Sequence, residues 1–363
     1  MRRIISSLCL FTVFACMAVP VSADVSAKSA IVLEATTKKT VYEKDADTRR
    51  PMASTTKIMT AVCAIESGDL SREITVTKEA AGVEGSSVYL KVGDELTLRE
   101  LVMALMLESA NDAATAIAIG ISGSVEAFAE LMNSKAAELG LNDTHFTNPH
   151  GLSDEDHYTT ARDLAHLAAY AMQNETFRSI VSTQNSTIEY GETVRHLHNH
   201  NKLLSMYDGT VGVKTGFTKV SGRCLVSAAE RDGLTLVAVT LDAPDDWNDH
   251  MAMLDTGFST LEWVNLIREG ESAFIVPCIG TEDGDIVIKS REGLSIILPR
   301  CEREIKRRVI LPHYLWAPVE KDSIVGRIEF FDGDEYLGEV SLYAEESADR
   351  IEYKKSALER IFN

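Results

Sequence analysis

The segment PMASTTKIMTA, residues 51–61, places Ser54 three residues ahead of Lys57 at the predicted start of a helix. Apolar residues recur at helical spacing over residues 58–65, and Ser-Gly-Asp at 67–69 predicts the end of this helix. Residues three apart share a helix face, so the side chains of Ser54 and Lys57 can touch. Lysine can take the proton of a serine nucleophile if burial and a neighbouring cation favour the neutral amine. Ser54 is therefore a candidate nucleophile and Lys57 its candidate base, although a helix cap beside a solvated lysine gives the same pattern.

A second candidate segment, Ser109-Ala110-Asn111, lies inside LTLRELVMALMLESANDAATAIAIGI, residues 96–121. The apolar residues keep helical spacing before this segment, and an alanine-rich helix is predicted to resume after it. A break in the helix would let two polar side chains leave an apolar stretch and face a cleft. Ser109 could then relay a proton to a leaving amine, and Asn111 could hold a substrate amide.

A third segment, Lys214-Thr215-Gly216, begins the predicted strand VGVKTGFTK. Lys214 would supply the second cation near the candidate base and, with Thr215, would direct charge and a hydroxyl at a carboxylate. Gly216 would let a substrate backbone approach closely. The backbone N–H groups of Ser54 and Phe217 are candidate donors to an oxyanion.

The first 23 residues, MRRIISSLCLFTVFACMAVPVSA, combine two arginines, an apolar run and small residues before Asp24. This pattern predicts a secretory signal peptide over residues 1–23, with an uncleaved membrane anchor as the alternative. The total formal charge is −19 and this segment carries two positive charges, so the exported chain would carry −21. Such an acidic chain is a poor nucleic-acid binder, and no nucleic-acid partner is expected.

The order of the predicted elements indicates an α/β catalytic domain followed by a small all-β domain. Residues 30–42 are predicted to form a hairpin, residues 70–180 to be mainly helical, and the stretch after residue 207 to form antiparallel strands that complete the sheet. Residues 249–267 predict an amphipathic closing helix, and Gly270 a domain boundary. The expected organisation is a catalytic domain over 24–270, a β domain over 271–346 and a possible amphipathic tail over 347–363.

Taken together, the three polar segments resemble the active-site signature of penicillin-binding proteins and serine β-lactamases. The stretches EGSSVYLKVGDELTLRELVMALMLESANDAA, HFTNPHGLSDEDHYTTARDLAHLA and NHNKLL resemble the D-alanyl-D-alanine carboxypeptidases, the low-molecular-weight penicillin-binding proteins of bacterial peptidoglycan. The resemblance covers almost all of residues 25–345 and implies a transpeptidase-like catalytic fold. It implies a serine-type enzyme, without a cofactor or metal, that removes the terminal D-alanine from peptidoglycan stem peptides through an acyl-enzyme. It also implies acylation by β-lactam antibiotics, and export to the cell wall or the outer face of the cytoplasmic membrane.

The same resemblance implies a role for each candidate residue. The implied roles are acyl-ester nucleophile for Ser54, proton acceptor for Lys57, proton relay for Ser109, substrate ligand for Asn111 and carboxylate ligand for Lys214. The sequence departs from the family pattern where some members have an arginine that helps to hold the terminal carboxylate. That stretch here is APDDWNDH, with Asp245 and Asp246, so Lys214 and Thr215 are the expected anchors.

Two other functions share parts of this pattern. A class A β-lactamase would need a glutamate in a Glu-x-x-x-Asn loop, and Glu138 and Asn142 have that spacing. The end of a helix capped by Gly140 explains the same residues. A catalytically weak wall-binding protein would keep the fold without needing the full set of polar residues.

A histidine cluster, a pair of cysteines and the C-terminal tail are further candidates for a metal site, a disulfide and a membrane contact. His196, His198 and His200 lie along an extended segment and could bind zinc, although no fourth ligand is evident. Cys278 and Cys301 could pair in an exported protein. The tail IEYKKSALERIFN could make a peripheral membrane contact, and an exposed helix end is the alternative.

Overall fold

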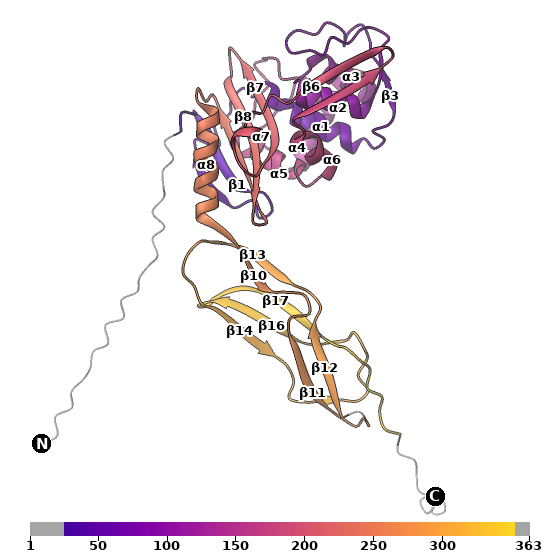
Figure 1. The fold of residues 1–363 in the computed structure, drawn as a ribbon, viewed down its shortest axis with the longest axis vertical. Coiled ribbons are helices and arrows are strands. Elements are labelled where there is room, and N and C mark those ends of the chain that lie inside the picture. Colours follow the sequence, from indigo (N-terminus) through magenta and orange to yellow (C-terminus); the bar gives the residue numbers. More distant parts are fainter. Residues whose placement is uncertain (1–24, 283, 353–363) are drawn as a thin grey trace, which may run out of the picture. The chain divides into compact units, whose positions relative to one another are not determined.

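The computed structural model describes residues 25–282 and 284–352, so the predicted signal peptide lies outside the described residues. The chain forms two compact units, drawn in sequence colours in Figure 1. The change from the first unit to the second falls after Gly257, and the hairpin tip Glu230–Leu236 is grouped with the second. The predicted boundary at Gly270 therefore lies inside the second unit.

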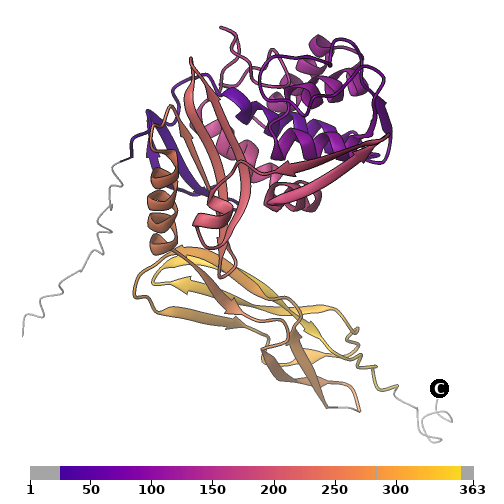
Figure 2. The same cartoon turned by 45° about the horizontal axis from the view of Figure 1, so that its top comes forward.

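The first unit is built around a five-stranded sheet in the order β2-β1-β9-β8-β7. The predicted N-terminal hairpin is confirmed, because β1 and β2 pair antiparallel, as do β7 and β8 further along the chain. In Figures 1 and 2 the orange helix α8 lies on one face of these strands and the indigo-to-magenta helices lie on the other. The strands are β1 (Ser29–Glu34), β2 (Thr40–Lys44), β7 (Thr210–Thr218), β8 (Gly222–Arg231) and β9 (Leu234–Leu241).

The helices of this unit bury their apolar faces in one core with the sheet. Ile31 of the sheet, Leu105, Phe128 and Val226 belong to this core and are fully buried. The helices are α1 (Lys57–Glu66), α2 (Leu98–Leu107), α3 (Asn111–Ser122), α4 (Val125–Glu138), α5 (Ala161–Ala171), α6 (Glu175–Ser182), α7 (Leu203–Met206) and α8 (Asp246–Thr260). Two small two-stranded sheets accompany them, β3 (Glu73–Thr75) with β4 (Glu95–Thr97) and the hairpin of β5 (Asn185–Tyr190) with β6 (Thr193–His198).

The break predicted between two helices near Ser109 is confirmed. Helix α2 begins at a reciprocal cap, in which Thr97 accepts from the N–H of Glu100 and the Glu100 carboxylate accepts from the N–H of Thr97. It ends at Leu107, and α3 begins at Asn111. Ser109 between them has a φ of 61°, which no residue within a right-handed helix can adopt. The chain therefore turns sharply where the polar segment lies.

The prediction of a closing helix over residues 249–267 was wrong at its C-terminal end. Helix α8 ends at Thr260, and β10 (Leu261–Ile267) pairs antiparallel with β13 (Leu294–Pro299). In the first half of the segment LEWVNLI, less and more exposed side chains alternate. This period of two residues is typical of a strand, and the prediction of a helix did not take it into account. This strand pairing is why the second unit begins before Gly270.

The second unit is all β, as predicted, in the part of it that the structure describes. Its larger sheet has the order β14-β16-β17-β12-β11-β15, around a core that includes Ile288, Phe330 and Leu342. Cys278 and Cys301 are not joined by a disulfide, so the pairing considered from the sequence is not formed. The strands of this sheet are β11 (Ala273–Ile279), β12 (Asp285–Ser290), β14 (Ile305–Ile310), β15 (Leu315–Trp316), β16 (Ile324–Asp332) and β17 (Glu335–Ala344).

Most of the predicted tail, residues 353–363, lies outside the described residues. Among the helices that the structure describes, none alone has both the length and the apolarity needed to span a membrane. Helices α3 and α4 meet that test only as a pair, with a bend of 84° between them.

Candidate active site

Ser54 and Lys57 lie together at the start of α1. Ser54 is in η1 (Ala53–Thr56), a single 3₁₀ turn that runs directly into α1, and Lys57 is the first residue of that helix. The Lys57 Nζ atom lies 3.0 Å from Ser54 Oγ. The predicted contact between nucleophile and base is therefore present.

The Lys57 amine is held by two oxygen atoms that can only accept hydrogen bonds. Its Nζ donates to Asn111 Oδ1 at 2.7 Å and to the carbonyl oxygen of His150 at 2.6 Å. A neutral amine has two N–H groups and one lone pair, so these two bonds use both donors and leave the lone pair for the hydroxyl of Ser54. The geometry fits a neutral lysine that accepts a proton from Ser54.

The electrostatic surroundings of Lys57 favour the same protonation state. Its side chain is fully buried, and this burial is the main reason that its pKa lies well below the ordinary lysine value. The charge of Lys214 lowers the pKa of Lys57 further, while Asp112 opposes both effects. Lys214 is buried as well, and burial lowers its own pKa to about 7.

Asn111 contributes to the site in a way that the sequence did not predict. Its Oδ1 accepts from Lys57, and its Nδ2 donates to the carbonyl oxygen of Glu84 at 2.5 Å. The Asn111 amide therefore links the candidate base to the loop before α2, while its expected contact with a substrate amide stays a prediction. Ser109, at the turn beside it, lines the same cleft as Ser54.

A buried carboxylate that was not predicted from the sequence, Asp112, supports this arrangement. Its oxygens accept from the Ser87 hydroxyl at 2.6 Å and from the N–H groups of Val88 and Leu90 at 3.3 and 3.0 Å. Three donors from one loop converge on this side chain, which fixes the loop that Asn111 contacts. An aspartate within an apolar helical stretch was the available signal, because a buried carboxylate needs partners.

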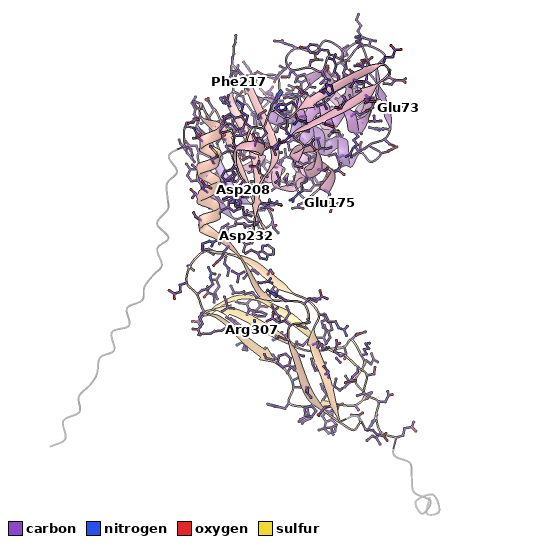
Figure 3. The ribbon with its side chains drawn as sticks, viewed as in Figure 1. Glu73, Glu175, Asp208, Phe217, Asp232 and Arg307 are labelled. Atoms are coloured by element: carbon purple, nitrogen blue, oxygen red, sulfur yellow. The ribbon has the colours of Figure 1, made fainter. Side chains whose placement is uncertain are left out.

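Strand β7 carries the third predicted segment along the other wall. Lys214 is buried and donates to the carbonyl oxygen of Thr215 at 2.9 Å. Phe217, labelled in Figure 3, is 65% exposed at the rim. A Cβ atom added to Gly216 would lie 3.0 Å from the Ser54 backbone nitrogen. Glycine at this position thus admits the turn that holds Ser54, and the close approach of a substrate backbone stays a prediction.

Most of these residues line a cleft of about 330 Å³. The predicted residues that line it are Ser54, Ser109, Thr215, Gly216 and Phe217. The cleft is also lined by polar, charged and aromatic side chains that were not assigned to the site from the sequence, namely Ser86, His200, Lys202, Arg223, Asp246 and Trp247. The site is therefore wider and more highly charged than the three motifs indicate.

The residues behind the alternative functions lie elsewhere or have other partners. Glu138 is at the end of α4, is 63% exposed and pairs with Lys135, and it does not line the cleft. His196 and His198 hydrogen-bond to Thr187 and Asn185. No group of three or more side chains suited to a metal ion occurs within residues 25–282 and 284–352.

A serine beside a buried lysine with a lowered pKa, at the end of a helix packed on an antiparallel sheet, defines a serine-dependent acyl-transfer enzyme. Residues 16–245 match the D-alanyl-D-alanine carboxypeptidase family, peptidase family S11, and residues 262–350 match the penicillin-binding protein 5 C-terminal domain. The chain belongs to this family of D-alanyl-D-alanine carboxypeptidases. The resemblance inferred from the sequence, the fold class and a serine-type carboxypeptidase activity are confirmed.

Individual relatives match over much of their length. The chain is 32% identical to D-alanyl-D-alanine carboxypeptidase DacF of Bacillus subtilis, over 88% of this chain and 85% of that protein. It is 30% identical to DacC of Escherichia coli, over 88% of this chain and 83% of that one. A crystal structure of DacD from Francisella tularensis superposes with a TM-score of 0.66 at 27% identity, covering 92% of this chain and 96% of that one. The Streptomyces K15 DD-transpeptidase structure has a TM-score of 0.62 at 35% identity, covering 65% and 98%.

Proposed function

We propose that Ser54 attacks the carbonyl group between the two terminal D-alanines of a peptidoglycan stem peptide. Lys57 takes the hydroxyl proton as the Ser54 Oγ–carbon bond forms. The observation that carries this assignment is the Lys57 Nζ atom, 3.0 Å from Ser54 Oγ, with both N–H groups used by Asn111 and His150. The N–H groups of Ser54 and Phe217 stabilise the oxyanion of the tetrahedral intermediate.

Collapse of that intermediate breaks the peptide bond and needs a proton on the departing nitrogen. Ser109, which lines the cleft with Ser54, passes the proton from Lys57 to the amine of the leaving D-alanine. Water then attacks the acyl-enzyme, the ester bond to Ser54 breaks and the hydroxyl regains its proton. The peptide leaves one residue shorter, with a new terminal carboxylate.

The substrate would bind as an extended peptide along β7. This strand is the last in the sheet order, and a strand at a sheet edge can pair through its backbone with an added peptide. Lys214 and Thr215, the anchors that the sequence predicted for the terminal carboxylate, lie on this strand. β-Lactam antibiotics would enter the same cleft and acylate Ser54.

The setting proposed for this reaction is outside the cytoplasm, at the cell wall or the outer face of the cytoplasmic membrane. Support comes from the signal-peptide pattern of residues 1–23 and from the substrate class of the family. The amphipathic pattern of the C-terminal tail supports a peripheral membrane contact.

Intact-protein mass spectrometry after incubation with benzylpenicillin tests the proposal. The wild type should gain the mass of the antibiotic, and Ser54→Ala should not. Wild-type protein without an adduct, or an adduct on another residue, would contradict the assignment of Ser54. An adduct that forms and disappears quickly would favour β-lactamase activity instead.

A further inference from the structure

Arg223, Asp246 and Trp247 form a charged wall of the cleft that has no assigned role. Arg223 is the second residue of β8 and lies opposite Phe217 of β7 in the strand register. Asp246 and Trp247 are the first two residues of α8. All three line the cleft that contains Ser54.

The Arg223 guanidinium is fixed in place by its neighbours. Its Nε and Nη2 atoms donate to Asp246 Oδ1 at 3.0 and 2.7 Å, and its Cζ atom lies 5.6 Å from the ring centroid of Trp247. The backbone of Arg223 is also tied to the segment before α8, because its carbonyl oxygen accepts from the N–H of Ala243 at 2.9 Å. The charged group is therefore held at a set position on the cleft wall.

The pairing with Asp246 leaves a second edge of the guanidinium open. Arginine has five N–H donors in a planar fork, and the two bonds to Asp246 use the edge formed by Nε and Nη2. The Arg223 side chain is 42% exposed, whereas that of Asp246 is 3% exposed. The edge that includes Nη1 can therefore bind a second carboxylate with two parallel hydrogen bonds.

Two other basic residues, Lys214 and Lys202, are less suited to this task. Lys214 is buried, its Nζ donates to Thr215, and burial lowers its pKa to about 7, so its charge is only partial near neutrality. An arginine stays protonated at every working pH. Lys202 also lines the cleft, on a long side chain without the planar fork of arginine.

We propose that Arg223 binds the terminal carboxylate of the substrate, and that Asp246 is the positioning residue that holds its guanidinium. Asp246 stands in the stretch where an arginine was expected, so the cation comes from β8 and the acidic residue orients it. This assignment rests on the proposed carboxypeptidase function and makes Arg223 a determinant of specificity for a free C-terminus. Loss of one charged hydrogen-bonded contact corresponds to a ten- to hundredfold fall in kcat/KM, as an order of magnitude.

The test compares a peptide that ends in D-Ala-D-Ala with the same peptide carrying a C-terminal amide. The wild type should prefer the acid, and Arg223→Gln should lose about ten- to a hundredfold in kcat/KM for the acid while changing little for the amide. Asp246→Asn should raise KM for the acid severalfold and leave the amide unchanged, which a general loss of structure would not do. Lys219→Gln removes an exposed cation from the turn after β7 and should behave like the wild type.

Three results would contradict the assignment of Arg223. Equal losses on both peptides, a preference for the acid that survives in Arg223→Gln, or a preference lost in Lys202→Gln alone would overturn it. If Arg223→Gln does not fold because Asp246 is left unpaired, the double variant Arg223→Gln/Asp246→Asn removes both charges and must show the same selective loss. A wild type that hydrolyses neither peptide would instead contradict the proposed function.

Discussion

The side chain of Asn111 accepts a 2.7 Å hydrogen bond from Lys57, which lies 54 positions earlier in the chain. The polar turn between α2 and α3 therefore holds the amine of the candidate base. With the carbonyl oxygen of His150 as a second acceptor, this contact orients a neutral amine so that its lone pair faces Ser54. The orientation of one lysine side chain is thus determined by residues from three parts of the chain.

Replacing Lys57 should strongly slow acylation of Ser54, because the proposed base is then missing. Lys57→Met removes the amine without burying a charge, and the rate of benzylpenicillin acylation should fall by about a hundred- to ten-thousandfold. Lys57→Arg should lose as much activity and also lower the melting temperature more, because a permanently charged guanidinium would be buried. Stopped-flow labelling and thermal unfolding measure the two effects, with the exposed Lys78→Met as control. Near-normal acylation by either variant would show that another group takes the proton.

The acylation rate should rise with pH through the lowered pKa of Lys57, because only the neutral amine can accept the Ser54 proton. Asn111→Asp places a carboxylate against Lys57 Nζ and stabilises the ammonium. The rise of the acylation rate with pH should therefore shift to higher pH by about one unit or more. The measurement is the saturating acylation rate across pH. Asn142→Asp, on an exposed turn, is the matched control. If the pH dependence of the acylation rate were the same in Asn111→Asp as in the wild type, a group other than Lys57 would control the rate.

Gly216→Ala should impair the active site more than it impairs the fold. The new Cβ would lie 3.0 Å from the Ser54 nitrogen and 3.1 Å from that of Thr55, both backbone atoms that move only with the turn. Such overpacking costs about 1–3 kcal/mol of stability, and displacement of Ser54 should reduce acylation much further. Gly293→Ala in the second unit, where the Cβ would be 3.2 Å from the Glu269 nitrogen, should destabilise without slowing acylation. Wild-type acylation by Gly216→Ala would contradict the close contact with the turn.

His250 should make the first unit sensitive to acid. It is fully buried between the hydroxyls of Ser227 and Thr240, and burial lowers its pKa to about 3. The unfolded chain binds a proton here at the ordinary value of 6.5 and the folded chain does not, so the free energy of unfolding falls as pH drops from 6.5 towards 3. The slope from this group is at most about 1.4 kcal/mol per pH unit.

The circular dichroism signal of the helices, followed during urea unfolding, reports on the first unit, which contains α1 to α7 and α8 as far as Gly257. His250→Gln should be less stable than the wild type at neutral pH but should lose less stability on acidification. His313→Gln, at an exposed position, should keep the wild-type slope. A slope in His250→Gln equal to that of the wild type would assign the acid sensitivity to other groups.

The sequence by itself determined the features that depend on residues close together in the chain. Ser54 and Lys57 are three positions apart, so helical geometry alone brings them into contact. The turn at Ser109 is likewise local, and both the helix start predicted beside Ser54 and the predicted break at Ser109 were correct. Where local periodicity was ambiguous, in the LEWVNLI segment, the prediction of a helix was wrong.

Only the tertiary structure decided which atoms surround these residues. The contact of Lys57 with the carbonyl oxygen of His150 and the ion pair between Arg223 and Asp246 join residues 93 and 23 positions apart. The burial that lowers the pKa of Lys57 likewise depends on the packed fold. Sequence spacing carries no information on such distances, because they depend on how helices and strands pack. Asn111 and Gly216 show the consequence: both were identified from the sequence as substrate-binding residues, and the fold adds contacts with Lys57 and with the turn that holds Ser54 that the sequence did not predict.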